Sequence, residues 1–175
     1  GLGKNDDIIV PSFSFQSTAN SVLYVGAKPI FVDIEEDTFG LDPSEILKHL
    51  TPSVKAIMPM DYGGMSCKIS DIKKIASENN LIVIEDAAEG LGSSVNGKKV
   101  GSISDSAIFS FCGNKVLTTG EGGAVVTNSK EISEKIKLIR SHGRLDNGNY
   151  FNDPSNPQYL SLGYNWRMSS ITASL

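Results

Sequence analysis

Two stretches of the sequence carry residue types that could do chemistry together. The first is AIFSFCGNKVLTTGEGGAVVTN, residues 107–128, which holds Lys115 in a short polar turn between two apolar segments that we expect to be strands. The turn is rich in glycine, which lets backbone or ligand approach closely because it has no Cβ. The second is LIVIEDAAE, residues 81–89, an apolar run that ends abruptly in two acids, the second being Asp86. We expect Lys115 and Asp86 to lie around one ligand.

The combination fits pyridoxal phosphate (PLP). A lysine amine can form a Schiff base with the aldehyde of this cofactor, and a carboxylate opposite the pyridine nitrogen keeps that nitrogen protonated. Lys115 and Asp86 are the candidates for these parts, Ser110 could bind the phosphate, and the small Ala88 would leave room beside the ring. Taken singly, Lys115 would be a surface lysine and Asp86 a helix or turn cap. The prediction of a PLP site therefore depends on these residues occurring together.

Strands and helices alternate in the first half of the sequence. Short apolar segments at 8–10, 29–34, 56–60 and 81–84 predict strands, and the segments between them predict helices. Such alternation favours βαβ units and a mostly parallel sheet covered on both faces. The expected class is α/β, with a three-layer α/β/α sandwich.

Local signals mark the helix ends. Ser12 or Ser14 could cap the start of the first helix, Gly26 is placed to end it, and Asp42 could cap the second helix. The third helix is predicted over residues 69–79. Its apolar face comprises Ile69, Ile72, Ile75 and Ala76.

The regular alternation of strands and helices does not continue in the second half of the sequence. SSVNGKKVG predicts a hairpin with its turn at Asn96-Gly97. An amphipathic helix is expected from the cap Ser129 to the stop Gly143, followed by a long surface loop over 144–159. A further helix is expected to begin within GYNWRMSSITASL.

Composition excludes some classes of protein. The chain has 175 residues with a net charge of −4, and its basic residues are scattered, which argues against a nucleic-acid partner. No apolar run approaches the roughly 20 residues of a membrane span. Cys67 and Cys112 fit no metal spacing and indicate a reducing cytosol, and we expect no metal site. The sequence starts without methionine and ends within a helix-like run, so we expect it to be part of a longer protein.

A nucleotide-binding module is the rival from another class. GSSVNGKK, residues 92–99, nearly matches the phosphate-binding P-loop, but lysine replaces the Ser or Thr that would bind magnesium. Its Asn-Gly centre suits a hairpin better. No G-x-G-x-x-G follows the first expected strand. His49 and His142 are interpreted as solvated or capping residues rather than metal ligands.

Four segments resemble the DegT/DnrJ group of PLP-dependent sugar aminotransferases, in family order over nearly the whole chain. They are VPSFSFQSTANSVLYVGAKPIFVDI, IEDAAEGLGS, FSFCGNKVLTTGEGGAVVTN and GYNWRMS. DAAEG and GNK-x-x-TTGEGG look closest to perosamine-synthase-like enzymes. The resemblance implies that residues 1–175 are part of a fold-type-I large domain, as in aspartate aminotransferase. The family's N-terminal segment and C-terminal small domain would lie outside this piece.

The resemblance also implies a role for each matching residue. Lys115 would be the Schiff-base lysine and then the acid–base that moves a proton between cofactor and substrate. Asp86 would face the pyridine nitrogen, Phe15 would stack on the ring and Ser110 would bind the phosphate. Glu89 occupies a place near the phenolic oxygen of the cofactor that glutamine often holds. A glutamate there would have to be protonated or paired.

A second subunit would complete the site. In this family the asparagine of the G-Y-N motif, here Asn165, reaches the cofactor phosphate of the partner subunit. Arg167, two residues later, is a candidate to contact the phosphate or the sugar nucleotide. The resemblance therefore implies a homodimer with shared active sites.

The expected reaction moves an amino group, from glutamate, to a nucleotide-linked keto-deoxy sugar such as a 4-keto-6-deoxyhexose. Such an enzyme would act in the cytoplasm, in polysaccharide biosynthesis such as that of O-antigen. The rivals on the same fold are a PLP-dependent sugar dehydratase and a regulatory relative, and Lys115 argues against the dehydratases that have histidine there. The sugar, the nucleotide and the aminated carbon are left open.

Overall fold

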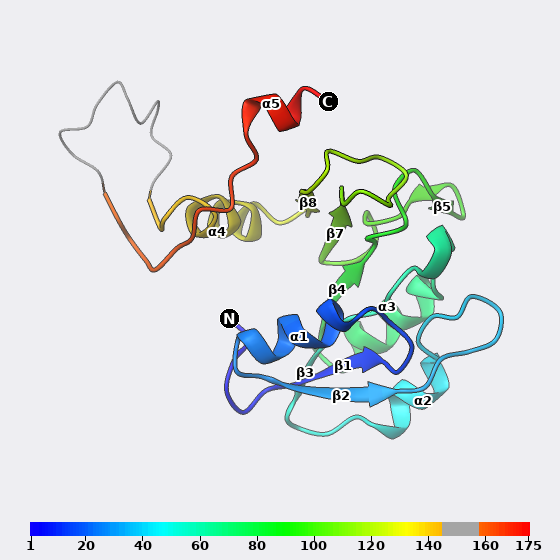
Figure 1. Cartoon of the computed structure of the whole chain (residues 1–175). Coiled ribbons are helices and arrows are strands. Elements are labelled where there is room, and N and C mark those ends of the chain that lie inside the picture. The colour runs from blue at the N-terminus through cyan, green and yellow to red at the C-terminus, as the bar shows by residue number, and fades with distance from the viewer. Residues whose placement is uncertain (145–157) are drawn as a thin grey trace. The chain divides into compact units, whose positions relative to one another are not determined.

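The computed structural model describes residues 1–144 and 158–175. The chain divides into two compact units, Gly1–Asn128 and Ser129–Leu175. The first unit contains the main sheet, and the described part of the second contains two short helices (Figure 1).

The sheet of the first unit has the strand order β2-β1-β3-β4-β7-β8. Neighbouring strands run parallel from β2 through β7, and β8 runs antiparallel to β7. The mostly parallel sheet expected from the sequence is thereby confirmed. The strands are β1 (Asp7–Pro11), β2 (Lys28–Val32), β3 (Val54–Ile57), β4 (Ile82–Asp86), β7 (Ser106–Ser110) and β8 (Gly123–Val126).

Helices cover both faces of this sheet, as predicted (Figure 1). On one face, α1 (Gln16–Tyr24) packs Val22 in a cluster with Ile8 and Val10 of β1. On the other, α2 (Pro43–Lys48) and α3 (Ile69–Glu78) pack against Ile9 of the same strand. The alternation along β1 follows from the strand pleat, which points successive side chains to opposite faces. The three-layer α/β/α arrangement is therefore built from two separate apolar clusters.

The start of α1 differs from the sequence-based expectation. The N-cap residue is Phe15, which makes no side-chain cap hydrogen bond. Ser14 instead contacts Thr18, with 2.6 Å between their hydroxyl oxygens, and Ser12 donates to Asp33 at 3.3 Å. The prediction of a serine cap was wrong because the Ser14 hydroxyl contacts Thr18 and Met60, and the Ser12 hydroxyl donates to Asp33.

Other local signals were correct. Gly26 follows α1 with φ +77°, the left-handed conformation that a helix-ending glycine adopts. Asp42 caps α2 by accepting a 2.7 Å hydrogen bond from the Ser44 N–H. The predicted apolar face of α3 is buried, including Ile72, which is 0% exposed.

The segment that resembles a P-loop forms a hairpin. Ser94–Val95 (β5) pairs antiparallel with Lys98–Lys99 (β6), and the turn residues Asn96 and Gly97 have φ of +50° and +75°. Positive φ at both central residues defines the type I′ turn that suits a two-residue hairpin. A P-loop would lead into a helix, so the nucleotide-binding rival loses its supporting motif.

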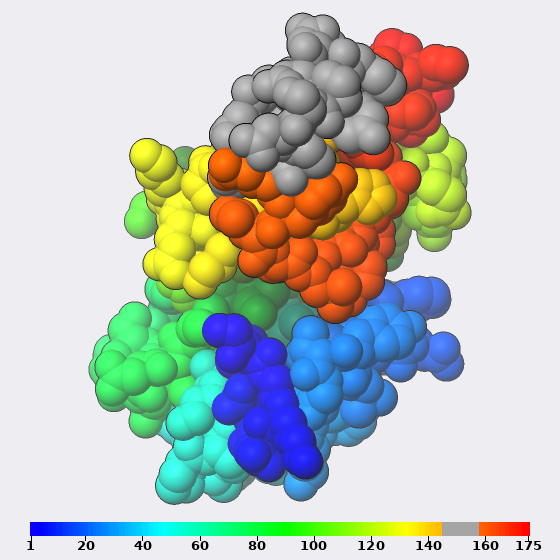
Figure 2. All heavy atoms as spheres, turned by 90° about the vertical axis from the view of Figure 1, so that its left-hand side faces the viewer, coloured from blue at the N-terminus to red at the C-terminus, as the bar shows by residue number. Residues whose placement is uncertain are grey.

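Cys67 is buried, Cys112 is half-buried, and both are free thiols. None of the helices within residues 1–144 and 158–175 is long and apolar enough to cross a membrane. The N-terminal residues, dark blue in Figure 2, lie on the surface of the first unit.

The second unit contains α4 (Lys130–Ile139) and α5 (Ser170–Ala173). Ser129 caps α4 as predicted, accepting a 3.3 Å hydrogen bond from the Ile132 N–H. The chain passes through Gly143 with φ +73° shortly after α4 ends. Most of the long loop predicted over 144–159 lies outside the described residues.

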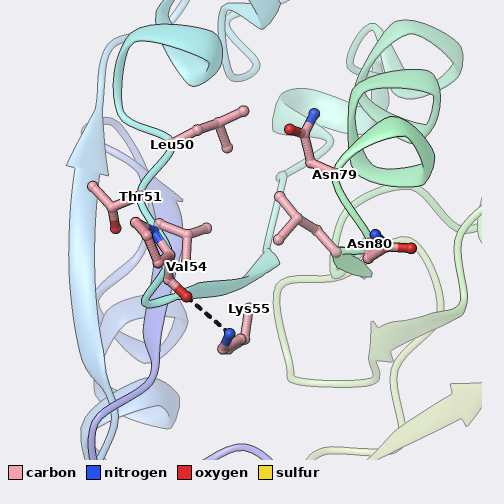
Figure 3. A pocket seen from close by; sticks show the side chains of 8 residues that line it. Leu50, Thr51, Val54, Lys55, Asn79 and Asn80 are labelled. Atoms are coloured by element: carbon pink, nitrogen blue, oxygen red, sulfur yellow. Dashed lines mark hydrogen bonds between the residues drawn. The ribbon is translucent and has the colours of Figure 1, made fainter.

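A cavity of about 400 Å³ opens at the amino ends of β3 and β4 (Figure 3). Val54 at the start of β3 and Leu81 just before β4 line it, together with residues around the end of α3. Lys55 turns its amine to the Pro52 carbonyl at 2.8 Å. The cavity therefore lies at the opposite end of these strands from Asp86.

We expect replacement of Ile72 by alanine to destabilise the protein by about 2–5 kcal/mol, because its fully buried side chain would leave a cavity under the sheet. Urea denaturation of the intact protein measures the change in free energy of unfolding. Lys74→Ala, at an exposed position of the same helix, is the matched control and should change it by less than about 0.5 kcal/mol. Equal effects of the two substitutions would contradict the assigned core.

Candidate functional site

The main chain of Asp86 is bound to the segment that follows β3. The Asp86 N–H donates to the Pro59 carbonyl at 2.7 Å, and the Asp86 carbonyl accepts from the Asp61 N–H at 3.0 Å. Met60 and Asp86 form a parallel bridge beyond the named strands. The pairing of β3 with β4 thus continues to the carboxyl end of β4, which fixes the backbone of Asp86.

Asp86 is 6% exposed, and its carboxyl group accepts hydrogen bonds from neutral donors. Its Oδ2 accepts from the Thr18 hydroxyl at 2.7 Å, and its Oδ1 accepts from the Ala88 N–H at 3.2 Å. Phe15 is the N-cap residue of α1 and precedes Thr18 by three residues in the sequence. The Phe15 side chain is 73% exposed, which leaves its ring free to meet a ligand near Asp86.

Lys115 pairs with Glu89. Its Nζ lies 3.2 Å from Glu89 Oε1, and the side chains are 18% and 31% exposed. Glu89 Oε2 accepts a 2.8 Å hydrogen bond from the Gly63 N–H. The Gly63 N–H, and next the Lys115 amine, hold the pKa of Glu89 below its usual value against the opposing effect of burial. Glu89 is therefore a paired carboxylate at neutral pH, one of the two states that the sequence left open.

Ser110 is the last residue of β7, beside the end of β4. The register of these strands pairs Asp86 with Ile108, so Ser110 lies two residues farther along the same edge. Its Oγ accepts from the Cys112 N–H at 3.3 Å. The turn after it is closed by a 2.9 Å hydrogen bond from the Phe111 N–H to the Gly122 carbonyl, and Lys115 lies within this turn.

These groups lie where an open α/β sheet binds ligands. The chain moves outward from β1 to β2 and then returns to the other side of β1 to form β3. Ligands bind beyond the carboxyl ends of the strands at such a reversal of strand order. Phe15 follows β1, Asp61 follows β3 and Asp86 ends β4, so the cluster occupies that edge.

Asn165 belongs to the second unit. It is exposed, forms a bridge with Ser141, and accepts a 3.0 Å hydrogen bond from the Arg167 Nε at its Oδ1. Its expected role toward a partner subunit stays a prediction.

The sequence analysis missed two residues that donate hydrogen bonds to the acids of the site. Thr18 binds the Asp86 carboxyl, and Gly63 binds Glu89. Thr18 and Asp86 are 68 positions apart in the sequence, so no local pattern indicated this contact. Nothing in the sequence pairs Gly63 with Glu89, since they are 26 residues apart and meet only through the fold.

Comparison with known proteins shows what the chain is similar to. The DegT/DnrJ/EryC1/StrS aminotransferase family matches residues 1–175. GDP-perosamine synthase of Caulobacter vibrioides is 43% identical over 175 residues, which is 100% of this chain and 45% of that protein. The chain thus spans about half the length of such relatives.

Solved structures share the fold. The aminotransferase of Psychrobacter cryohalolentis superimposes with a TM-score of 0.93 at 36% identity, covering 99% of this chain and 45% of that one. The putative sugar aminotransferase Spr1654 of Streptococcus pneumoniae, in its PLP form, gives a TM-score of 0.89 at 25% identity, covering 99% and 48%. The similarity therefore extends across nearly the whole of this chain.

We expect Thr18→Val to destabilise the protein by about 1.5–3 kcal/mol, because it removes a hydrogen bond to the buried Asp86 carboxylate. Thr18→Ser keeps the hydroxyl and is the matched control, with a smaller loss. Urea denaturation at neutral pH compares the two. If valine were tolerated as well as serine, the hydrogen bond would not support Asp86.

Proposed function

Because the chain belongs to the DegT/DnrJ/EryC1/StrS aminotransferase family, we propose that it is part of a PLP-dependent aminotransferase that acts on a nucleotide-linked keto-deoxy sugar. The observation that carries the proposal is the pairing of Lys115 with Glu89 at the sheet edge that also holds Asp86. A lysine whose side chain is only 18% exposed there has a chemical environment that a surface lysine lacks. The name of the Caulobacter relative supports the class of substrate.

The residues present fit PLP by their donor chemistry. Asp86 is a buried carboxyl held by neutral donors, which suits a protonated ring nitrogen. Phe15 offers an exposed ring for stacking, and the small Ala88 leaves space. Ser110 offers a hydroxyl for the phosphate. The cofactor, when bound, supplies an electron sink for breaking bonds at the carbon that carries the amino nitrogen.

Lys115 would hold the cofactor through its amine and then move a proton. Its Nζ is placed by Glu89, whose other oxygen is fixed by the Gly63 N–H. An acid–base group must lie within hydrogen-bond reach of the proton that it takes, and small displacements reduce catalysis strongly. Glu89 would provide that position and keep a negative charge beside the amine.

Further parts of the proposal concern the whole protein. We propose glutamate as the amino donor, ping-pong kinetics, and a cytoplasmic homodimer in which Asn165 of each chain serves the partner's cofactor phosphate. Residues 1–175 would form part of the large domain, with an N-terminal segment and a small domain outside them. A same-fold sugar dehydratase or regulatory protein is the alternative, and it differs by producing no amino sugar.

Borohydride reduction of the full-length protein with PLP tests the role of Lys115. We expect one stable adduct on Lys115, and Lys115→Ala should lower transaminase activity by about a hundredfold or more, because the acid–base group is lost. Lys98→Ala, an exposed hairpin lysine, is the control and should keep both adduct and activity. An adduct on another lysine, or full activity of Lys115→Ala, would contradict the assignment.

A panel of nucleotide-linked keto sugars with glutamate tests the substrate class. We expect formation of an amino-deoxy sugar together with 2-oxoglutarate, measured by mass spectrometry. PLP bound at Lys115 without transfer to any keto sugar would favour the regulatory alternative. Loss of a hydroxyl without gain of nitrogen would favour the dehydratase.

A further inference from the structure

A pair of buried acids lies under the site and has no part in the function proposed above. Asp61 is 0% exposed and Glu85 is 1% exposed. Asp61 follows β3, whereas Glu85 lies in β4 next to Asp86 and faces away from it. Two neighbouring buried carboxylates repel one another, and each is costly to desolvate. A pair in which both are charged is therefore unfavourable.

Each acid has one oxygen satisfied and one without a donor. Asp61 Oδ1 accepts from the Cys67 N–H at 2.9 Å. Glu85 Oε2 accepts from the Ser104 hydroxyl at 2.6 Å and from the Gly101 N–H at 3.1 Å. The remaining oxygens, Asp61 Oδ2 and Glu85 Oε1, are buried and have no hydrogen-bond partner among the residues that the structure describes. Because Met60 pairs with Asp86, the strand pleat puts the neighbouring residues Asp61 and Glu85 on the same face of the sheet. There the charge of Glu85 acts on Asp61.

One proton satisfies both of the remaining oxygens. Two carboxylates offer only acceptors, whereas a carboxylic acid beside a carboxylate donates an O–H to it. Such a charge-assisted O–H···O⁻ bond is stronger than a neutral one, and one negative charge in place of two lowers the repulsion. The Gly90 backbone also packs closely here, since a Cβ on it would lie 3.2 Å from Asp61 Oδ2 and 2.9 Å from Val100 Cγ1.

We propose that Asp61 and Glu85 share one proton, and that this acid pair positions the active-site loop rather than reacting with substrate. Asp61 is the residue from which the short 3₁₀ helix η1 (Tyr62–Gly64) begins. Gly63 of η1 donates to Glu89, which pairs with Lys115. The Asp61 N–H also binds the Asp86 carbonyl. The shared proton thus fixes the loop that contacts both Glu89 and Asp86.

The electrostatics around the pair agree with this assignment. Burial, and then the charge of Glu85, raise the pKa of Asp61 to about 7. The titratable group beside the pair on the loop is the Cys67 thiol, whose pKa burial also raises well above its usual value. The segment after β6 contributes the neutral Ser104 hydroxyl and Gly101 N–H. The acid pair therefore retains the shared proton in the folded protein below about pH 7.

The acid pair makes the opening of the loop depend on pH. The folded protein keeps a proton that an unfolded or open chain releases above the ordinary aspartate pKa of 3.8. The pair therefore favours the closed loop most at low pH, and this contribution is lost as pH rises through about 7. The equilibrium for opening of the loop should rise by about tenfold per pH unit over that window and then level off.

Hydrogen exchange of the full-length protein, followed by mass spectrometry on the peptide that contains residues 61–67, measures this opening. After correction for the intrinsic exchange rate, we expect the wild-type opening constant to rise about tenfold per unit between about pH 5 and about pH 7. Asp61→Asn and Glu85→Gln should remove the slope, because an amide donates permanently to the remaining carboxylate. Glu78→Gln, at an exposed site, is the control and should keep it.

Infrared spectroscopy detects the shared proton without any reference to activity. At about pH 6, the wild-type protein should show a protonated-carboxyl C=O band that both variants lack, although ordinary carboxyl groups are ionised there. Retention of the wild-type exchange slope in Asp61→Asn, or an unchanged band, would overturn the proposal. If neither variant folds, a wild-type spectrum with no protonated carboxyl that titrates near neutral pH would also overturn it. None of these results depends on transaminase activity, so the two proposals can fail separately.

Discussion

The candidate site depends on the way the main chain of Asp86 is bound. Its N–H and carbonyl both bond to the segment after β3, through Pro59 and Asp61, although β3 itself ends at Ile57. The parallel pairing therefore continues to the last residue of β4, where a strand end would otherwise be frayed. This fixes the direction of two adjacent side chains. Asp86 turns to α1, and Glu85 turns to the opposite face.

Three acids around the end of β4, Asp86, Glu89 and Glu85, have three different kinds of surroundings. Asp86 is satisfied by a neutral hydroxyl and an N–H, which leave it able to attract a positive ligand atom. Glu89 is only partly buried and has a lysine partner and a backbone donor. Glu85 is fully buried, has no cation partner within the described part of the chain, and feels the charge of another acid, Asp61. An unpaired buried charge is costly. The surroundings of each acid therefore decide its protonation state more than its residue type does.

Much of the fold could be predicted because its signals are local. Apolar periodicity located the strands and the buried face of α3, and Asn96-Gly97 specified its own turn. The cap of α1 could not be predicted in this way. Ser14 is a good cap by residue type, but its hydroxyl meets Thr18 and Met60 in the fold. The support of Asp86 by Thr18 likewise joins residues 68 positions apart, and no local pattern encodes that contact.

The position of Lys115 follows from a change in strand direction. A parallel crossover after β7 would need a helix and would carry the chain away from the carboxyl edge. The antiparallel return of β8 allows the intervening turn to stay at that edge, closed between Phe111 and Gly122. Gly120 and Gly122 adopt φ of +80° and +151° in this turn, which residues with a side chain rarely adopt. The glycines noted in the sequence therefore serve the path of the chain, and that path holds the lysine beside Glu89 at the end of a parallel sheet.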